Sequence, residues 1–167
     1  MMNTATLRKR GEGKIVISPT FNSRSNLRIL LVEDDESSQR LTLHILMKIG
    51  MKVDVAANGH EALLAILRSS YDVILMDVTL PGLSGLEVTS MIREQEAGLH
   101  VWIVALTACA MKGDRKRCLE AGMDAYLSKP FIGKELIDLL QKLGGLNKID
   151  SAYSSKQMRE IHGDEPL

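Results

Sequence analysis

Cysteine, aromatic residues and long apolar runs are all scarce in this sequence of 167 residues. Cys109 and Cys118 are its only cysteines, and neither has a second Cys or a His at the spacing of zinc ligands, so a zinc site is not predicted. No stretch approaches the ~18 consecutive apolar residues of a membrane-spanning helix, and the N-terminus lacks the apolar segment of a secretory signal. We therefore expect a cytoplasmic protein with reduced thiols and no membrane partner.

An excess of either charge is also absent, because 21 Lys and Arg residues balance 21 Asp and Glu residues. A nucleic-acid partner is therefore not indicated, since proteins that bind nucleic acids carry a basic surface. Hydrophobic residues make up 45% of the chain, which is enough for the core of one domain of ordinary size. The composition thus favours a single globular domain.

The two ends of the chain differ from its middle. Residues 1–26 contain five basic residues and one acidic residue, and we expect a disordered tail there, with a basic arm for a partner as the alternative. Residues 145–167 are mixed polar, and a disordered tail or a short helix is expected for them. They are too few to form an independent output domain. The folded domain is therefore placed at residues 27–144.

The middle of the chain alternates short apolar runs with amphipathic helical patterns. The apolar runs are residues 27–32, 52–56, 72–76, 101–106 and 124–127. This alternation predicts an α/β fold, a three-layer α/β/α flavodoxin-like (βα)5 sandwich with helices on both faces of a parallel sheet. In the second run Val53 and Val55 alternate with polar residues, which is typical of an edge strand. The strands richest in aliphatic residues should be central, and the order 2-1-3-4-5 satisfies this.

Start and stop signals mark the predicted helices. Asn58 with Glu61 and Ser84 with Glu87 each have the spacing of a capping box, while Gly50 and Gly122 are placed to end helices. The first helix is expected to bury Leu41, Ile45, Leu46 and Ile49, the second Ala62, Leu63, Ile66 and Leu67, and the third Leu86, Met91 and Ile92.

Polar residues follow all five predicted strands. In chain order they are Glu33 with Asp34, Asn58, Asp77, Thr107 and Lys129. Parallel strands bring their carboxyl ends to one edge of the sheet, where ligands of such folds bind, so these side chains should lie together. Clustered carboxylates repel one another unless a cation joins them, and oxygen ligands favour a hard ion such as Mg²⁺. The sequence therefore predicts a magnesium site at this edge.

Asp77 is the candidate nucleophile, because a carboxylate can accept a phosphoryl group and form an acyl phosphate. The metal ion and Lys129 would neutralise charge on the phosphoryl oxygens, and the Thr107 hydroxyl can hydrogen-bond the phosphate. Taken singly, each residue also has an ordinary structural explanation. Asp34 or Asp35 could cap the following helix, Thr107 could be a plain strand end, and Lys129 could be a surface lysine.

Four motifs, in order and at matching spacing, resemble a receiver domain of the bacterial response-regulator family. They are Leu-Val-Glu-Asp-Asp-Glu at 31–36, Asp-Val-Thr-Leu-Pro-Gly at 77–82, Ala-Leu-Thr-Ala at 105–108 and Tyr-Leu-Ser-Lys-Pro-Phe at 126–131. The resemblance covers residues 29–143, about 70% of the chain. The stretch 105–131 is particularly similar to receivers of hybrid sensor histidine kinases.

The resemblance implies a role for each residue of the acidic edge. Asp77 would be the phosphoacceptor, and Glu33 with Asp34 would form the acidic pair, a choice over Asp35 that counting back from Gly50 favours. Asp34 and Asp77 would ligate Mg²⁺ directly together with the backbone carbonyl of Thr79, and Glu33 would act through a water molecule.

The resemblance also implies how the phosphoryl group is bound and how the domain responds to it. Lys129 would pair with the phosphate, and its bond to Pro130 would be cis. Thr107 and Tyr126 would be the switch pair, with the hydroxyl moving toward the phosphate and the ring following inward. Thr79 and Cys109 would flank the water that attacks the acyl phosphate. Neither side chain activates water well, so slow self-dephosphorylation is expected.

The function implied is that of a phosphoacceptor in two-component or phosphorelay signalling. The donor would be a sensor histidine kinase, a histidine-phosphotransfer domain or both. A downstream protein target would contact the face formed by the fourth helix, fifth strand and fifth helix, and a homodimer is left open. The chain would be no enzyme beyond catalysing its own modification. His44, His60, His100 and His162 are expected to be solvated surface residues rather than phosphoryl donors.

Two other classes of function are weighed against this interpretation. An unphosphorylated, receiver-like interaction module would be expected to lack the acceptor, the lysine or an acidic residue, and all of these are present. A flavodoxin-like redox protein is disfavoured because Glu33, Asp34 and Asp35 after the first strand repel a phosphate. An aspartyl-phosphate hydrolase needs a second Asp two residues after its nucleophile, where this chain has Thr79.

Overall fold

Five parallel strands form one sheet in the computed structural model, which describes residues 27–96, 100–108 and 112–144. Their order is β2-β1-β3-β4-β5, as predicted. The strands are β1 (Arg28–Val32), β2 (Lys52–Ala56), β3 (Val73–Asp77), β4 (Trp102–Thr107) and β5 (Ala125–Ser128). Three of them begin and end one residue later than the apolar runs of the sequence, and β3 therefore includes Asp77 as its last residue. The predicted tails, residues 1–26 and 145–167, lie outside the described residues.

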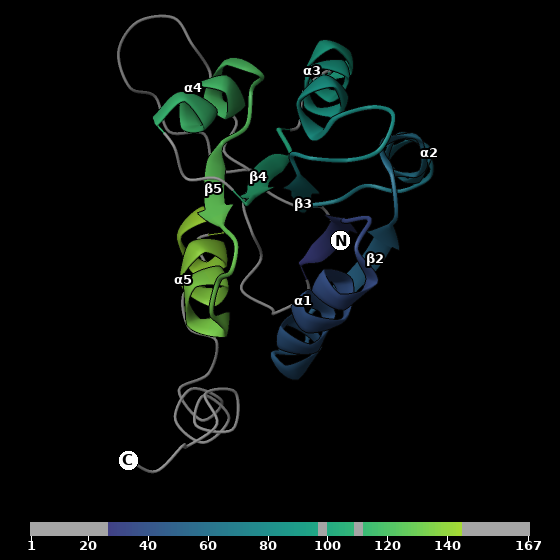
Figure 1. Ribbon diagram of the computed structural model, residues 1–167. Coiled ribbons are helices and arrows are strands. Elements are labelled where there is room, and N and C mark those ends of the chain that lie inside the picture. The colour runs from purple at the N-terminus through teal and green to yellow at the C-terminus, as the bar shows by residue number, and fades with distance from the viewer. Residues whose placement is uncertain (1–26, 97–99, 109–111, 145–167) are drawn as a thin grey trace, which may run out of the picture.

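A helix follows each strand, and the helices cover both faces of the sheet (Figure 1). They are α1 (Glu36–Lys48), α2 (Gly59–Arg68), α3 (Gly85–Gln95), α4 (Lys112–Glu120) and α5 (Gly133–Gly144). Buried side chains of α1 and α5 share one apolar cluster, whereas those of α2, α3 and α4 share the other. The predicted three-layer α/β/α architecture is confirmed.

The central strands are buried on both faces, as expected for a parallel sheet covered by helices. Successive residues of β1 point to opposite sides, so Ile29 and Leu31 join the cluster under α1 and α5, while Leu30 and Val32 join the other. Every residue of β3 is buried. The outer strand β2 is largely exposed, in agreement with its alternating sequence. This rigid sheet fixes the residues at its carboxyl edge.

The residues predicted to begin and end helices do so in the structure. Ser84 begins α3 with a complete capping box, in which Glu87 returns a bond to the backbone of Ser84. Asn58 caps α2 by accepting a hydrogen bond from the Glu61 N–H at 3.0 Å. Gly50 and Gly122 have φ angles of 76° and 97°, a left-handed conformation that favours glycine where a helix ends.

Three side chains expected on the buried helix faces are exposed instead. Leu41 in α1 is 55% exposed, Leu67 in α2 is 74% exposed and Met91 in α3 is 40% exposed. In α1 the buried face is centred on Thr42, Ile45 and Leu46, and one residue along a helix turns the side chain by about 100°. Helical spacing alone fits either Leu41 or Thr42 on the buried face. The hydrophobic character of Leu41 favoured Leu41, whereas the structure buries Thr42.

None of the helices in the described part of the chain has the length and apolar character that crossing a bilayer requires.

Candidate functional site

The predicted constellation comes together at the carboxyl edge of the sheet. Asp77 ends β3 and Thr107 ends β4, while Glu33 follows β1 and Lys129 follows β5. Glu33, Asp77 and Thr107 are buried polar residues. The backbone N–H of Lys129 donates to the Thr107 carbonyl at 2.7 Å, which extends the pairing of β4 with β5 by one residue. The Lys129–Pro130 peptide bond is cis, as the resemblance implied.

The Asp77 carboxylate is held by donors on both of its oxygens. Oδ1 accepts a hydrogen bond from the backbone N–H of Thr79 at 2.7 Å, and Oδ2 accepts one from the Lys129 ammonium at 2.7 Å. Only 10% of the side chain is exposed. The carboxylate is therefore fixed in orientation but still reachable from the edge of the sheet.

Lys129 connects two carboxylates that are distant in the sequence. Its ammonium forms ion pairs with both Glu33 and Asp77. Burial acts to lower the pKa of Lys129, but the hydrogen bonds to the two carboxylates outweigh it, so the pKa is raised above its ordinary value. The side chain remains a full positive charge at neutral pH.

Glu33 is the most buried acid of the site, with 1% of its surface exposed. Burial raises the pKa of its carboxyl group, and the hydrogen bond from Lys129 offsets this only in part. The Gln39 side chain donates to the Glu33 carbonyl. We did not identify Gln39 from the sequence, where a polar residue in the first turns of a helix carries no distinguishing signal.

Glu33, Asp34 and Asp77 can place one carboxylate oxygen each within 4.8 Å of one another. This set of donors fits a hard cation, because it offers only oxygen. Three carboxylates facing one ammonium leave a formal charge of −3 + 1 = −2 at the site, which a divalent ion would neutralise. The residues present thus suit Mg²⁺, and the Thr79 carbonyl remains a predicted ligand.

Asp35 has a different structural role from Glu33 and Asp34. Its Oδ1 accepts a hydrogen bond from the Ser38 N–H at 2.8 Å and caps α1. That backbone hydrogen bond lowers the pKa of Asp35. The cap leaves Asp34, rather than Asp35, beside Glu33 and Asp77. Asn58, the remaining strand-end residue of the sequence analysis, serves as the cap of α2.

The predicted switch residues occupy neighbouring strands. Thr107 is 8% exposed at the end of β4, whereas Tyr126 in β5 is 39% exposed. The guanidinium carbon of Arg115 in α4 lies 5.1 Å from the centroid of the Tyr126 ring. Cys109, predicted to flank the attacking water, lies outside the described residues.

Gly85 is a supporting residue that sequence reasoning missed. A Cβ atom at this position would lie 2.0 Å from the backbone oxygen of Asp77, far inside van der Waals contact. The Gly85 N–H donates to the Val78 carbonyl at 3.1 Å. Glycine therefore lets the start of α3 pack directly against the end of β3, at the backbone of Asp77. A glycine just after a helix cap was the available signal.

Three of the four histidines lie within the described residues. His44 and His60 are exposed, in agreement with the prediction. His100 is also exposed but is not simply solvated, because its ring bonds Glu96 at 3.2 Å and Asp124 at 2.7 Å. The end of α3 and the loop before β5 meet at this point, a contact between segments that the sequence pattern does not reveal.

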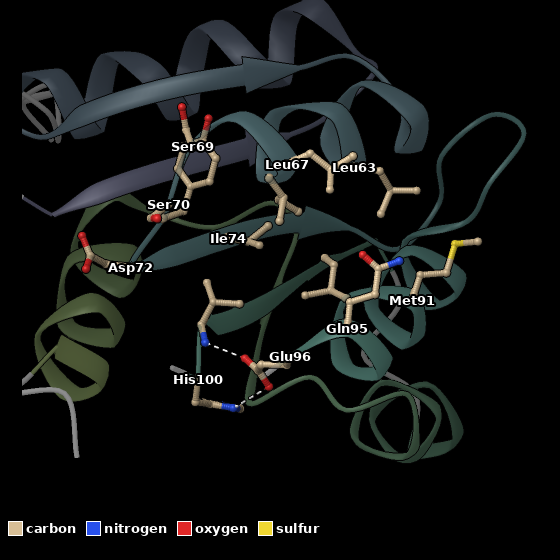
Figure 2. A pocket seen from close by; sticks show the side chains of 14 residues that line it. Leu63, Leu67, Ser69, Ser70, Asp72, Ile74, Met91, Gln95, Glu96 and His100 are labelled. Carbon is tan, nitrogen blue, oxygen red and sulfur yellow. Dashed lines mark hydrogen bonds and ion pairs between the residues drawn. The ribbon is translucent and has the colours of Figure 1, made fainter. Parts of the chain in front are cut away.

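A groove of about 560 Å³ lies between α2 and α3, and neither Asp77 nor the acids after β1 line it (Figure 2). Leu63, Leu67, Ile74 and Met91 give it apolar walls, and Asp72, Glu96 and His100 lie toward its ends. Asp72 accepts a hydrogen bond from the Arg28 N–H, and Glu96 pairs with Arg93 and His100. The acidic groups of the groove are thus engaged within the fold.

Comparison with known proteins gives one consistent family. The sequence model described as "Response regulator receiver domain" matches residues 29–141. A hybrid signal transduction histidine kinase I of Dictyostelium discoideum is 42% identical over 120 residues, which are 68% of this chain and 7% of that protein. The polar-differentiation response regulator DivK of Brucella anthropi is 36% identical over 117 residues, 70% of this chain and 95% of the regulator.

Solved structures agree with the sequence relatives. The receiver domain of sensor histidine kinase PA1611 from Pseudomonas aeruginosa, crystallised with a magnesium ion coordinated in its active site cleft, has 46% identity and a TM-score of 0.67. The match covers 72% of this chain and 98% of that structure. The chemotaxis protein CheY4 of Vibrio cholerae matches with the same TM-score at 30% identity, over 70% of this chain and 98% of that structure.

Proposed function

The chain belongs to the response regulator receiver domain family of two-component systems, and from this membership we propose that Asp77 accepts a phosphoryl group from a partner's phosphohistidine. One observation carries the proposal above all others. The Asp77 Oδ2 lies 2.7 Å from the Lys129 ammonium, and the same ammonium pairs with Glu33. A buried carboxylate beside a fixed cation and two further acids is a site built for an anionic group held together with a metal ion.

In the proposed reaction an oxygen of Asp77 attacks the phosphorus atom of the donor. A new P–O bond forms as the P–N bond to the imidazole breaks, and the donor imidazole leaves with the bonding electron pair and takes up a proton. The product is a mixed carboxylic–phosphoric anhydride on Asp77. The N–H of Thr79, which donates to Oδ1 at 2.7 Å, orients the carboxylate for attack.

Lys129 and Thr107 bind the transferred group. The Lys129 ammonium, now paired with Asp77, is placed to contact a phosphoryl oxygen once the acyl phosphate has formed. Thr107 ends the adjacent strand, and its hydroxyl can donate to a second phosphoryl oxygen. Tyr126, next along the edge, follows Thr107 inward and changes the outer surface of β5.

Glu33, Asp34 and Asp77 would hold the magnesium ion, with the Thr79 carbonyl as a further ligand. When bound, the ion neutralises charge on the phosphoryl oxygens and lowers repulsion between the incoming group and the carboxylates. The receiver structure of PA1611 contains magnesium in its cleft, which supports the same ion here.

The proposed donor is a sensor histidine kinase or a histidine-phosphotransfer domain. The chain spans only 4–15% of the length of the first hybrid kinases and sensor proteins it matches, but 95% of DivK. Relatives therefore include both receivers within large kinases and small separate regulators. The output would be a changed affinity of the face formed by α4, β5 and α5 for a protein target.

The test is to incubate the full chain with Mg²⁺ and acetyl phosphate and to measure its intact mass. One phosphoryl adduct is expected, lost in Asp77→Asn and retained in Asp35→Asn, because Asp35 caps α1 and is not one of the three carboxylates grouped around Asp77. An unchanged mass in a folded, magnesium-binding protein would contradict the proposal and favour an interaction module that is not phosphorylated. If an adduct forms, its half-life tests the slow self-dephosphorylation expected from Thr79 and Cys109, and a half-life of seconds would contradict that expectation.

A further inference from the structure

Arg115 and Tyr126 form a cation–π pair across the outer edge of the domain. The guanidinium carbon lies 5.1 Å from the ring centroid, within the ~6 Å over which a cation is attracted to an aromatic face. Tyr126 is 39% exposed, so its ring stands outward from β5. Arg115 therefore contacts the ring in the outward position and would lose this contact if the ring moved inward.

Four other charged residues of α4 pair with one another. Arg117 pairs with Asp114 at 3.7 Å, and Lys116 pairs with Glu120 at 3.6 Å. Within the described part of the chain, Arg115 makes no ion pair, and its guanidinium lies against the Tyr126 ring. No ion pair among the described residues therefore accounts for the position of the Arg115 guanidinium over the ring.

We propose that Arg115 is a positioning residue that holds Tyr126 outward and so opposes activation, an inference that rests on the switch role of Tyr126 in the proposed function. A residue that contacts only one of two states shifts their ratio by the strength of that contact. An exposed cation–π contact corresponds to a factor of about two to five. Arg115 would thus set how far the unphosphorylated protein already populates the inward state.

The position of the Tyr126 ring and ligand binding at Asp77 are thermodynamically linked. The change in the ratio of ring positions can therefore be measured as a change in ligand affinity. If removing the guanidinium raises the ratio of inward to outward rings, ligands that favour the inward state must bind more tightly by a similar factor. Beryllofluoride with Mg²⁺ is a suitable probe, because it occupies the place of a phosphoryl group without forming a transferable bond. The readout therefore separates a positioning role from a merely structural one, which would change stability alone.

The experiment follows the Tyr126 ring by NMR in the full chain with ¹³C-labelled tyrosine, with the signal assigned through Tyr126→Phe. Arg115→Met should move the unliganded ring signal toward its position in the beryllofluoride complex and tighten beryllofluoride binding about two- to fivefold. Arg115→Lys, which keeps a cation, should have a smaller effect. Arg117→Met is the matched control, because it removes the same charge two residues away and should change neither quantity.

The outcomes distinguish this inference from the function on which it rests. If beryllofluoride moves the ring but Arg115→Met behaves like Arg117→Met, Arg115 does not hold the ring and only the inference fails. If beryllofluoride binds without moving the ring in any variant, the switch role of Tyr126 fails, and the inference with it. A shift of the ring signal away from the liganded position in Arg115→Met would also overturn the proposal.

Discussion

Lys129 places one ammonium group against two buried carboxylates, Glu33 and Asp77. At the scale of single residues this contact determines the chemistry of the site. It keeps the Asp77 carboxylate oriented, and it offsets part of the cost of burying Glu33. The sequence predicted that these three residues would meet, because strand ends of a parallel sheet share an edge. It did not predict that Lys129 would bridge both acids, which depends on side-chain reach.

Replacing Lys129 with Met should slow phosphorylation by acetyl phosphate about 10²–10³-fold, because a fixed positive charge is lost where the phosphoryl oxygens gather. Intact-mass time courses at saturating Mg²⁺ measure the rate. Lys134→Met serves as the control, since Lys134 is half exposed and, among the described residues, pairs with Asp138 on the same helix α5 alone. A Lys129→Met protein that keeps its fold and the wild-type rate would remove Lys129 from the mechanism.

The choice among Glu33, Asp34 and Asp35 also belongs to the residue scale. The residues alone left open whether Asp34 or Asp35 caps the helix, and the family resemblance favoured Glu33 and Asp34 as the acidic pair. The structure separates them through backbone geometry, since Asp35 accepts the Ser38 N–H and Glu33 and Asp34 remain with Asp77. Arg115 was missed for a related reason, because its contact with Tyr126 joins two elements whose relative placement no local pattern specifies.

At the scale of elements, caps and glycines were the most reliable signals. The capping box at Ser84 and the helix ends near Gly50 and Gly122 follow from local backbone chemistry. The buried faces of helices were less well predicted, as Leu41 and Leu67 show. Burial depends on how each helix is rotated against the sheet, and this rotation is set by the packing of the whole layer.

Two glycine substitutions should have opposite effects on stability. Gly85→Ala forces a Cβ into the Asp77 carbonyl and should lower the free energy of unfolding by about 1–3 kcal/mol or more. Gly113→Ala in α4, where a Cβ would meet nothing within 4 Å, should raise it by about 0.5–1 kcal/mol. Urea denaturation of both variants checks the signs. Equal changes in the free energy of unfolding would show that the close approach of α3 to β3 does not determine the effect of Gly85→Ala.

Arg93 joins three elements at the opposite end of the sheet. It donates to the Gly122 and Val101 carbonyls at 2.8 and 2.9 Å and pairs with Glu96 and Asp124 at 2.9 and 2.7 Å. Only 16% of its side chain is exposed. These contacts tie the end of α3 to the residues just before β4 and β5, and thereby help to fix the outer part of the sheet that carries Thr107 and Tyr126.

Arg93→Met should therefore lower the free energy of unfolding by about 3–5 kcal/mol, because it leaves partly buried carboxylates without their cation. The exposed pair of Arg40 with Glu36 on α1 provides the control, and Arg40→Met should change stability by about 0.5 kcal/mol or less. Denaturant unfolding monitored by circular dichroism gives both values. A loss for Arg93→Met no larger than that for Arg40→Met would mean that the network adds little.

At the scale of the whole molecule, the sheet order and the position of the site followed from the alternation of runs and helical patterns. β1 and β3 lie side by side, so the acids after β1 and the end of β3 meet at the point where the chain changes direction in the sheet. The long-range contacts that set the exposure of Tyr126 and the groove between α2 and α3 could not be derived in this way. They depend on how whole layers pack together.

Locating the phosphoryl group tests the central claim most directly. The full chain is treated with acetyl phosphate and Mg²⁺, reduced with borohydride so that an aspartyl phosphate becomes homoserine, and digested for peptide mass spectrometry. We expect homoserine at position 77 alone, and none when Mg²⁺ is withheld. Homoserine at another aspartate, or none at all in folded protein that binds Mg²⁺, would contradict the account.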